Sequence, residues 1–174
     1  SNFAELLDHA VDRDGETATI DFFDQGVQLT AAEFRDEVYR LADGLSRFGI
    51  TSGSFVGVLM PNRIEFPITW MALGVLGAVM VPANPASTGQ ELDHIFLDTG
   101  VTHLVVQQDL VAAASAATEW MATHKPHLIA LDRGVVGDSA EADRSSWEHL
   151  RGQGDTGFRP DAVVSGSDLV NIQY

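Results

Sequence analysis

The sequence predicts an α/β protein with an open, doubly wound, mostly parallel sheet, helices on both faces and a small β-hairpin before it. From Thr30 onward, segments with helical spacing alternate with short apolar segments. Those apolar segments lack the alternation of apolar and polar residues that a strand with one solvent-exposed face shows, so we expect helices to cover both faces of the sheet. Right-handed crossovers then make the strands parallel. The 174 residues, 45% hydrophobic and 20% charged, suit one core, and we expect a single domain over 1–174.

The first expected elements are a helix at Phe3–Val11 and a hairpin with strands at Ala18–Phe23 and Val27–Leu29. The clearest helix follows, because Thr30 and Glu33 form a capping box. Behind it runs one apolar stripe at steps of four and three residues: Phe34, Val38, Leu41, Leu45 and Phe48. Gly49 supplies a left-handed stop.

Strands and helices alternate after that point. The expected strands are Phe55–Met60, Ala78–Val81, His103–Val106, Leu128–Leu131 and a last one beginning at Asp168–Tyr174. The first expected helix is Ile64–Leu76, and the second is opened by the Thr88–Glu91 capping box and closed by Gly100. The third is Leu110–Met121, with Leu110, Ala114, Ala117 and Met121 on one face. The last is Trp147–Leu150, capped by Ser145 or Ser146. Glycine-rich polar stretches predict loops at Arg133–Ala142 and Gly152–Pro160.

The charge balance excludes several partners. Ten Lys+Arg against 25 Asp+Glu give a formal net charge of −15, so we expect neither nucleic acid nor an anionic membrane surface as a partner. The apolar run Phe66–Ala83 is interrupted by Gly74 and Gly77, which argues against a membrane span. Without cysteine there is no disulfide or thiolate, and with no signal-peptide pattern we expect a cytoplasmic protein.

No catalytic constellation is visible, so we assign no catalytic, cofactor-binding or metal-binding residue. Pro126 keeps His124 and His127 off a shared helical face, and His94 with Asp98 is best explained as a solvated pair. Gly74 and Gly77 follow a helix and precede a strand, the reverse of the dinucleotide fingerprint. Met60-Pro61-Asn62 lies past a strand's carboxyl end, where such sheets place ligands, but we favour a strand-ending turn, which explains the same residues without a ligand.

Three segments together resemble the adenylate-forming (AMP-binding) superfamily. Leu29-Thr30-Ala31-Ala32-Glu33-Phe34 is similar to its first core motif, with Ala31 in place of the usual aromatic residue. Leu73–Pro85 resembles the second motif, a helix, Gly-Ala, strand and Val-Pro pattern. Asp168–Tyr174 resembles the strand that leads into the third motif, the phosphate loop. Asn84-Pro85 after the Val-Pro is typical of acyl-CoA synthetases, and the similarity runs from about Ala18 to Tyr174.

The resemblance implies the amino-terminal portion of a large AMP-binding domain that ends just before the phosphate loop. The complete enzyme would use ATP and Mg to activate a carboxylic acid as an acyl-adenylate and transfer it to a thiol, either CoA or a carrier protein. The remainder of the chain would supply that chemistry, and we expect the fragment to be inactive by itself and to hold no cofactor.

Two other interpretations stay open. One is a catalytically inert binding module on the same scaffold. The other is a small flavodoxin-like nucleotide-binding domain, which is opposed by the lack of a glycine-rich phosphate turn after any strand. An uncovered strand edge also predicts self-association or marginal stability.

Overall fold

The computed structural model describes residues 2–17, 19–132, 146–160, 164–165 and 168–173. The amino-terminal elements are α1 (Phe3–Asp14), β1 (Thr19–Phe22), β2 (Val27–Thr30) and α2 (Ala31–Arg47). The sheet region contains β3 (Phe55–Leu59), α3 (Glu65–Leu76), β4 (Val79–Pro82), α4 (Gly89–Thr99), β5 (His103–Gln107), η1 (Gln108–Leu110), α5 (Val111–Ser115), α6 (Thr118–His124), β6 (His127–Leu131) and α8 (Trp147–Gly152).

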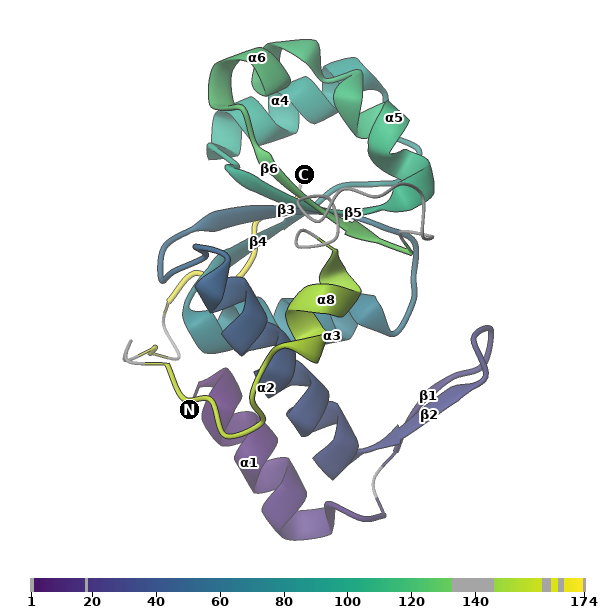
Figure 1. The fold of residues 1–174 in the computed structure, drawn as a ribbon, viewed down its shortest axis with the longest axis vertical. Coiled ribbons are helices and arrows are strands. Elements are labelled where there is room, and N and C mark those ends of the chain that lie inside the picture. Colours follow the sequence, from purple (N-terminus) through teal and green to yellow (C-terminus); the bar gives the residue numbers. More distant parts are fainter. Residues whose placement is uncertain (1, 18, 133–145, 161–163, 166–167, 174) are drawn as a thin grey trace.

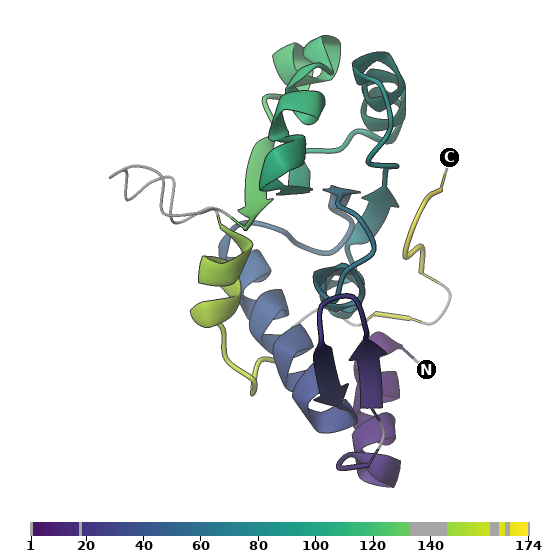
Figure 2. The ribbon, with the colours of Figure 1, turned by 90° about the vertical axis from the view of Figure 1, so that its right-hand side faces the viewer.

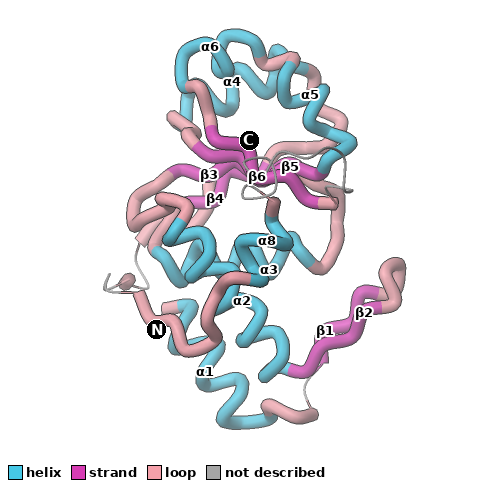
Figure 3. Tube along the Cα trace, in the orientation of Figure 1, coloured by secondary structure: helices cyan, strands magenta, loops and turns pink. Residues whose placement is uncertain are grey.

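The central sheet confirms the predicted fold class. Its four strands run in the order β4-β3-β5-β6, and every neighbouring pair is parallel. Helices α1, α2, α3 and α8 lie on one face, and α4, α5 and α6 lie on the other (Figures 1 and 3). Since the chain moves outward from β3 to β4 and then returns to β5 on the opposite side, the sheet is doubly wound and its switch point lies between β3 and β5.

Each face of the sheet buries its own core. Between the sheet and α2, α3 and α8 lie large apolar side chains that include Leu41, Leu45 and Leu73, all fully buried. On the other face, Phe96 of α4 and Trp120 of α6 pack with their ring centroids 4.6 Å apart. A sheet covered on both faces needs apolar residues at consecutive positions, which is why β3 and β5 show no polar alternation.

The two predicted capping boxes are present. The Thr30 hydroxyl accepts a hydrogen bond from the Glu33 amide while the Glu33 carboxylate accepts one from the Thr30 amide, and Thr88 and Glu91 repeat the arrangement at α4. The α2 stripe is also confirmed, because Phe34, Val38, Leu41 and Leu45 are all buried.

The β1–β2 hairpin extends away from the sheet, and its tip is tied back to α3 (Figure 1). The side-chain oxygen of Gln25 accepts a hydrogen bond of 2.6 Å from the amide of Ile64, the residue that precedes α3. Its side-chain nitrogen donates to Glu65 at 3.4 Å. No side chain of α3's own first turn caps this helix, so Gln25 acts as the cap from a distance.

The single helix predicted at Leu110–Met121 is wrong. The segment forms η1, α5 and α6, with a break at Ala116–Ala117 where Ala117 has a non-helical ψ of 72°. The carboxylate of Asp93 on α4 accepts hydrogen bonds from the amides of Glu119 and Trp120, and thereby starts a new helix. The predicted apolar face is nevertheless confirmed, because Ala114 and Ala117 are fully buried and Leu110 and Met121 pack against the same core, to which α6 adds Trp120.

The strand predicted from Asp168 is also wrong in extent. It is reduced to an isolated parallel bridge between Asn171 and Met80, made by two hydrogen bonds: Met80 N–H to Val170 O at 2.9 Å and Ile172 N–H to Met80 O at 3.0 Å. This segment runs along the β4 edge, on the side of the molecule opposite α8 (Figure 2).

The remaining predicted elements are present with ends shifted by a few residues. Helix α1 runs three residues further than predicted, to Asp14, and Gly152 closes α8 rather than opening the loop that follows it. Ser146 caps α8 through the His149 amide. The loop predicted at Arg133–Ala142, and Ser145, lie outside the described residues.

Candidate functional site

Open α/β sheets bind ligands outside the carboxyl ends of their strands, at the switch point. Here that position lies beyond β3 and β5, where Met60 is buried and Pro61 and Asn62 are exposed. The predicted strand-ending turn is therefore in the place where a ligand would be expected. Beside it, the side-chain oxygen of Gln107, at the end of β5, is buried and has no hydrogen-bond partner within the described part of the chain.

An ion-pair network closes this edge of the sheet. The Arg63 guanidinium donates to Glu65 at 2.6 and 2.8 Å and also to Asp132, the residue after β6. Asp132 has a left-handed φ of 54°, and its amide donates to Glu148 of α8 at 2.9 Å. The network thus links the starts of α3 and α8 to the ends of β3 and β6.

The charges of this network are stabilised in their ionised forms. Hydrogen bonds from Arg63 to Glu65 and to Asp132 raise the pKa of Arg63. Burial is the largest single influence on Glu65 and would raise its pKa, but the hydrogen bonds from Arg63, the backbone and Gln25, together with the charge of Arg63, lower the pKa below its usual value. Since the guanidinium is engaged by both carboxylates, Arg63 has a structural role here and is poorly placed to bind a free anion.

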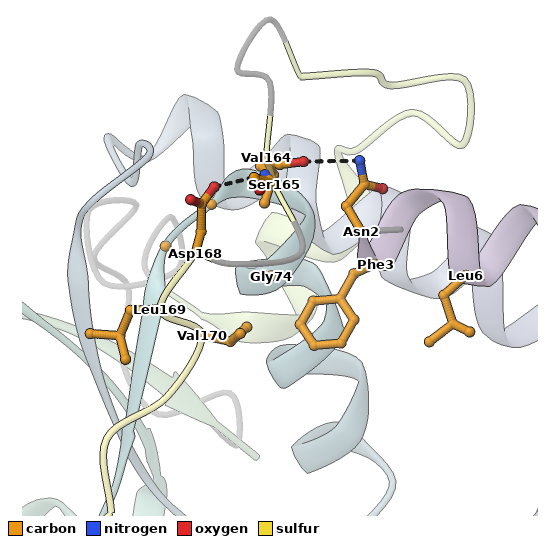
Figure 4. A pocket seen from close by; sticks show the side chains of 11 residues that line it. Asn2, Phe3, Leu6, Gly74, Val164, Ser165, Asp168, Leu169 and Val170 are labelled. Carbon is orange, nitrogen blue, oxygen red and sulfur yellow. Dashed lines mark hydrogen bonds between the residues drawn. The ribbon is translucent and has the colours of Figure 1, made fainter.

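A pocket of about 190 Å³ lies where the second and third motif segments meet (Figure 4). Phe3 of α1 lies directly on Gly74 of α3, so closely that a Cβ at Gly74 would come within 1.8 Å of the phenyl ring. Gly77 ends α3 with a left-handed φ of 71° and turns the chain into β4. Close contact and backbone conformation therefore explain both glycines, and no phosphate turn is needed, as the sequence predicts.

Polar groups frame one side of this pocket. The Asn2 side-chain nitrogen donates to the Val164 carbonyl at 3.1 Å, and the Ser165 amide donates to the Asp168 carboxylate at 2.7 Å (Figure 4). Asp168 is the one charged side chain among the described residues that line it. Such a lining can hold a small apolar group.

The histidines considered in the sequence lie apart. His124 ends α6 and His127 begins β6, while His94 and Asp98 lie on α4 beside a surface hollow shared with Asp93 and Glu119. Across the described residues no three His, Cys, Asp or Glu side chains come together in a way that could hold a metal ion. We therefore derive no chemical step from these side chains.

Sequence reasoning missed the Arg63 network and the orphaned Gln107 oxygen. Arg63 and Asp132 are 69 residues apart, and only the strand order brings them together. The available signal was positional, because Arg63 and Gln107 each lie at or just beyond the carboxyl end of a predicted strand.

Comparison with known proteins gives the family. The model of the family described as AMP-binding enzyme matches residues 7–174. This chain belongs to the AMP-binding enzyme family. The match covers nearly the whole chain, includes all three motif segments and decides against a flavodoxin-like domain.

Several relatives of this family member are named as CoA ligases or CoA synthases. Over 83 residues, 47% of this chain, it is 39% identical to 4-coumarate–CoA ligase 4 of Arabidopsis thaliana, of which it covers 15%. It is also 39% identical over 94 residues, 52% of this chain, to a feruloyl-CoA synthase of an Amycolatopsis species, of which it covers 19%. The solved long-chain-fatty-acid–CoA ligase of Archaeoglobus fulgidus superposes with a TM-score of 0.80 at 26% identity, with 100% of this chain and 34% of that one aligned. The chain thus spans less than a fifth of these two curated relatives and about a third of that solved enzyme.

No helix among the residues placed by the structure is long and apolar enough to cross a bilayer.

Proposed function

We propose that this chain serves as the amino-terminal part of an acid–thiol ligase. The complete protein activates a carboxylic acid with ATP as an acyl-adenylate and passes the acyl group to CoA or a carrier-protein thiol. The family match over residues 7–174 carries this proposal.

The arrangement of the motif segments supports it. The first segment supplies the cap of α2, the second forms α3, its left-handed end and β4, and the third runs beside β4 through the Asn171–Met80 bridge. Two of the three thus lie side by side around one pocket. In this role the chain provides part of the scaffold, and ATP, Mg and the thiol are bound by residues beyond it.

The substrate class follows from the relatives alone. The names of two of them, 4-coumarate–CoA ligase and feruloyl-CoA synthase, specify aromatic acids, and the name of the solved enzyme specifies long-chain fatty acids. We propose a carboxylic acid with an apolar body as the substrate, and a cytoplasmic location where ATP and CoA are available.

Calorimetry with Mg-ATP tests whether ATP binding requires residues beyond this chain. The 174-residue chain is expected to show no micromolar affinity, because its sequence has no glycine-rich phosphate turn after any expected strand. The control is the polypeptide extended to the length of the solved relatives, which is expected to bind ATP and catalyse acid-dependent pyrophosphate exchange. Micromolar binding by the 174-residue chain, or no exchange by the extended one with any of several aromatic and fatty acids, contradicts the proposal.

The inert binding module remains the second candidate. It is favoured by one observation, the 190 Å³ apolar pocket, which needs no catalytic group. The gene decides between the two: a stop codon directly after Tyr174 supports the module, and a downstream run rich in Ser, Thr and Gly supports the ligase.

A further inference from the structure

Two histidines meet at the amino edge of the sheet, the edge opposite the switch point. His103 and His127 are the first residues of β5 and β6 and are register partners. Their rings stack with centroids 5.2 Å apart and planes 29° from parallel. Phe48, the residue that ends α2, meets both rings edge-on at 6.1 and 6.0 Å.

The two rings differ in exposure. His103 is 9% exposed and its Nδ1 lies 3.0 Å from the Thr102 hydroxyl, whereas His127 is exposed. A proton on His103 must therefore be held in a partly desolvated site beside a second imidazole.

The charged groups on the surrounding elements do not compensate this charge. On α2 the nearest is Arg47, whose guanidinium is bound to Asp43 and to the carbonyl of Gln153. The turn before β6 carries His124 and Lys125, and Lys125 adds a positive charge. On α8, the Glu148 carboxylate accepts a hydrogen bond from the Asp132 amide, Arg151 donates to Glu37, and His149 lies between them in the sequence. Strand β3 begins without a charged residue.

We propose that His103, His127 and Phe48 form an acid-sensitive latch that holds the end of α2 against the amino edge of the sheet. When both imidazoles are neutral, they stack on each other and the Phe48 ring packs edge-on against both. When both are protonated, two like charges share one stack, and one ring must leave it. Phe48 then loses its partners and the end of α2 is released.

The direction of the pH effect follows from the buried partner. Burial, and secondarily His127, lower the pKa of His103 below its usual value. The unfolded chain therefore binds this proton at a higher pH than the folded chain does. The stabilisation is complete above the unfolded pKa of about 6.5 and is lost as the pH falls below it.

Urea unfolding at pH 7.5 and pH 5.5 tests the latch. The midpoint of the wild-type chain is expected to fall between the two values. His103→Phe, which keeps an aromatic ring and removes the titration, is expected to lose at least half of that fall. His9→Gln, which removes an exposed imidazole from α1, is the matched control and is expected to keep the whole of it.

Imidazole NMR titration of the wild-type chain gives a second measurement that does not depend on a variant folding. The His103 midpoint is expected to lie below the usual histidine value of about 6.5, and the Phe48 ring signals are expected to shift with the same midpoint. His127→Gln should raise the His103 midpoint. A His103 midpoint at or above about 6.5, an unresponsive Phe48, or an unchanged pH effect in a folded His103→Phe chain would each overturn the proposal.

Discussion

Gln25 shows how one side chain can connect two elements that are distant in the sequence. It lies at an exposed hairpin tip, yet its amide group satisfies the Ile64 N–H and reaches Glu65. The first N–H groups of a helix have no carbonyl partner within the helix, and an N–H that hydrogen-bonds neither water nor a side chain destabilises the fold. The contact therefore matters to α3 more than to the hairpin that carries it.

Replacing Gln25 by alanine is expected to lower the free energy of unfolding by about 1 kcal/mol, the usual loss for a helix cap. Gln28→Ala, an exposed position on β2, is the control and is expected to be neutral within about 0.5 kcal/mol. Urea denaturation measures both. A Gln25→Ala chain as stable as Gln28→Ala would show that water caps α3 equally well.

At the scale of elements, the contact between α2 and α8 depends on a glycine. A Cβ added to Gly44 would lie 2.1 Å from the Leu150 carbonyl oxygen, an atom of the α8 backbone that cannot rotate away. By contrast, a Cβ added to Gly152, the last residue of α8, would meet open space.

Gly44→Ala is expected to destabilise the chain by about 1–3 kcal/mol, because α8 must shift away from α2. Gly152→Ala is expected to be neutral or slightly stabilising, since alanine has the higher helix propensity. Thermal unfolding of the two variants side by side measures the difference. Equal melting temperatures would mean that α8 is not held against α2 in solution.

At this scale, features set by neighbouring residues could be predicted from the sequence, and features set by residues far apart in the chain could not. A capping box is complete within four residues, so Thr30–Glu33 and Thr88–Glu91 could be read from the sequence. The break between α5 and α6 depends on Asp93, which lies 26 residues before Glu119 in another helix. The site shows the same limit, because Gln107 becomes unusual only when packing removes every partner of its oxygen.

For the whole molecule, exposed apolar side chains set the expected behaviour in solution. Leu6 and Leu169, which line the pocket of Figure 4, are each 54% exposed. A net charge of −15 opposes association of two copies at low salt. Added salt screens that repulsion, and the apolar attraction remains.

We therefore expect the chain to self-associate, and to do so more in 0.5 M salt, on the order of the concentration at which the Debye length falls below 5 Å. Light scattering at two salt concentrations measures the mass. The double variant Leu6→Lys, Leu169→Lys should remain closer to a monomer at high salt. A wild-type chain that is a monomer in both buffers would contradict the expectation.

Both outer strands of the sheet are met by a single residue: Asn171 bridges to Met80 on β4, and Ser146 bridges to Ala130 on β6. A further strand that paired with either edge of the sheet would replace one isolated bridge and leave the pairing of the four strands intact. The architecture can therefore grow sideways in evolution, by insertion after β6 or by lengthening the segment beside β4, without disturbing the two cores already formed.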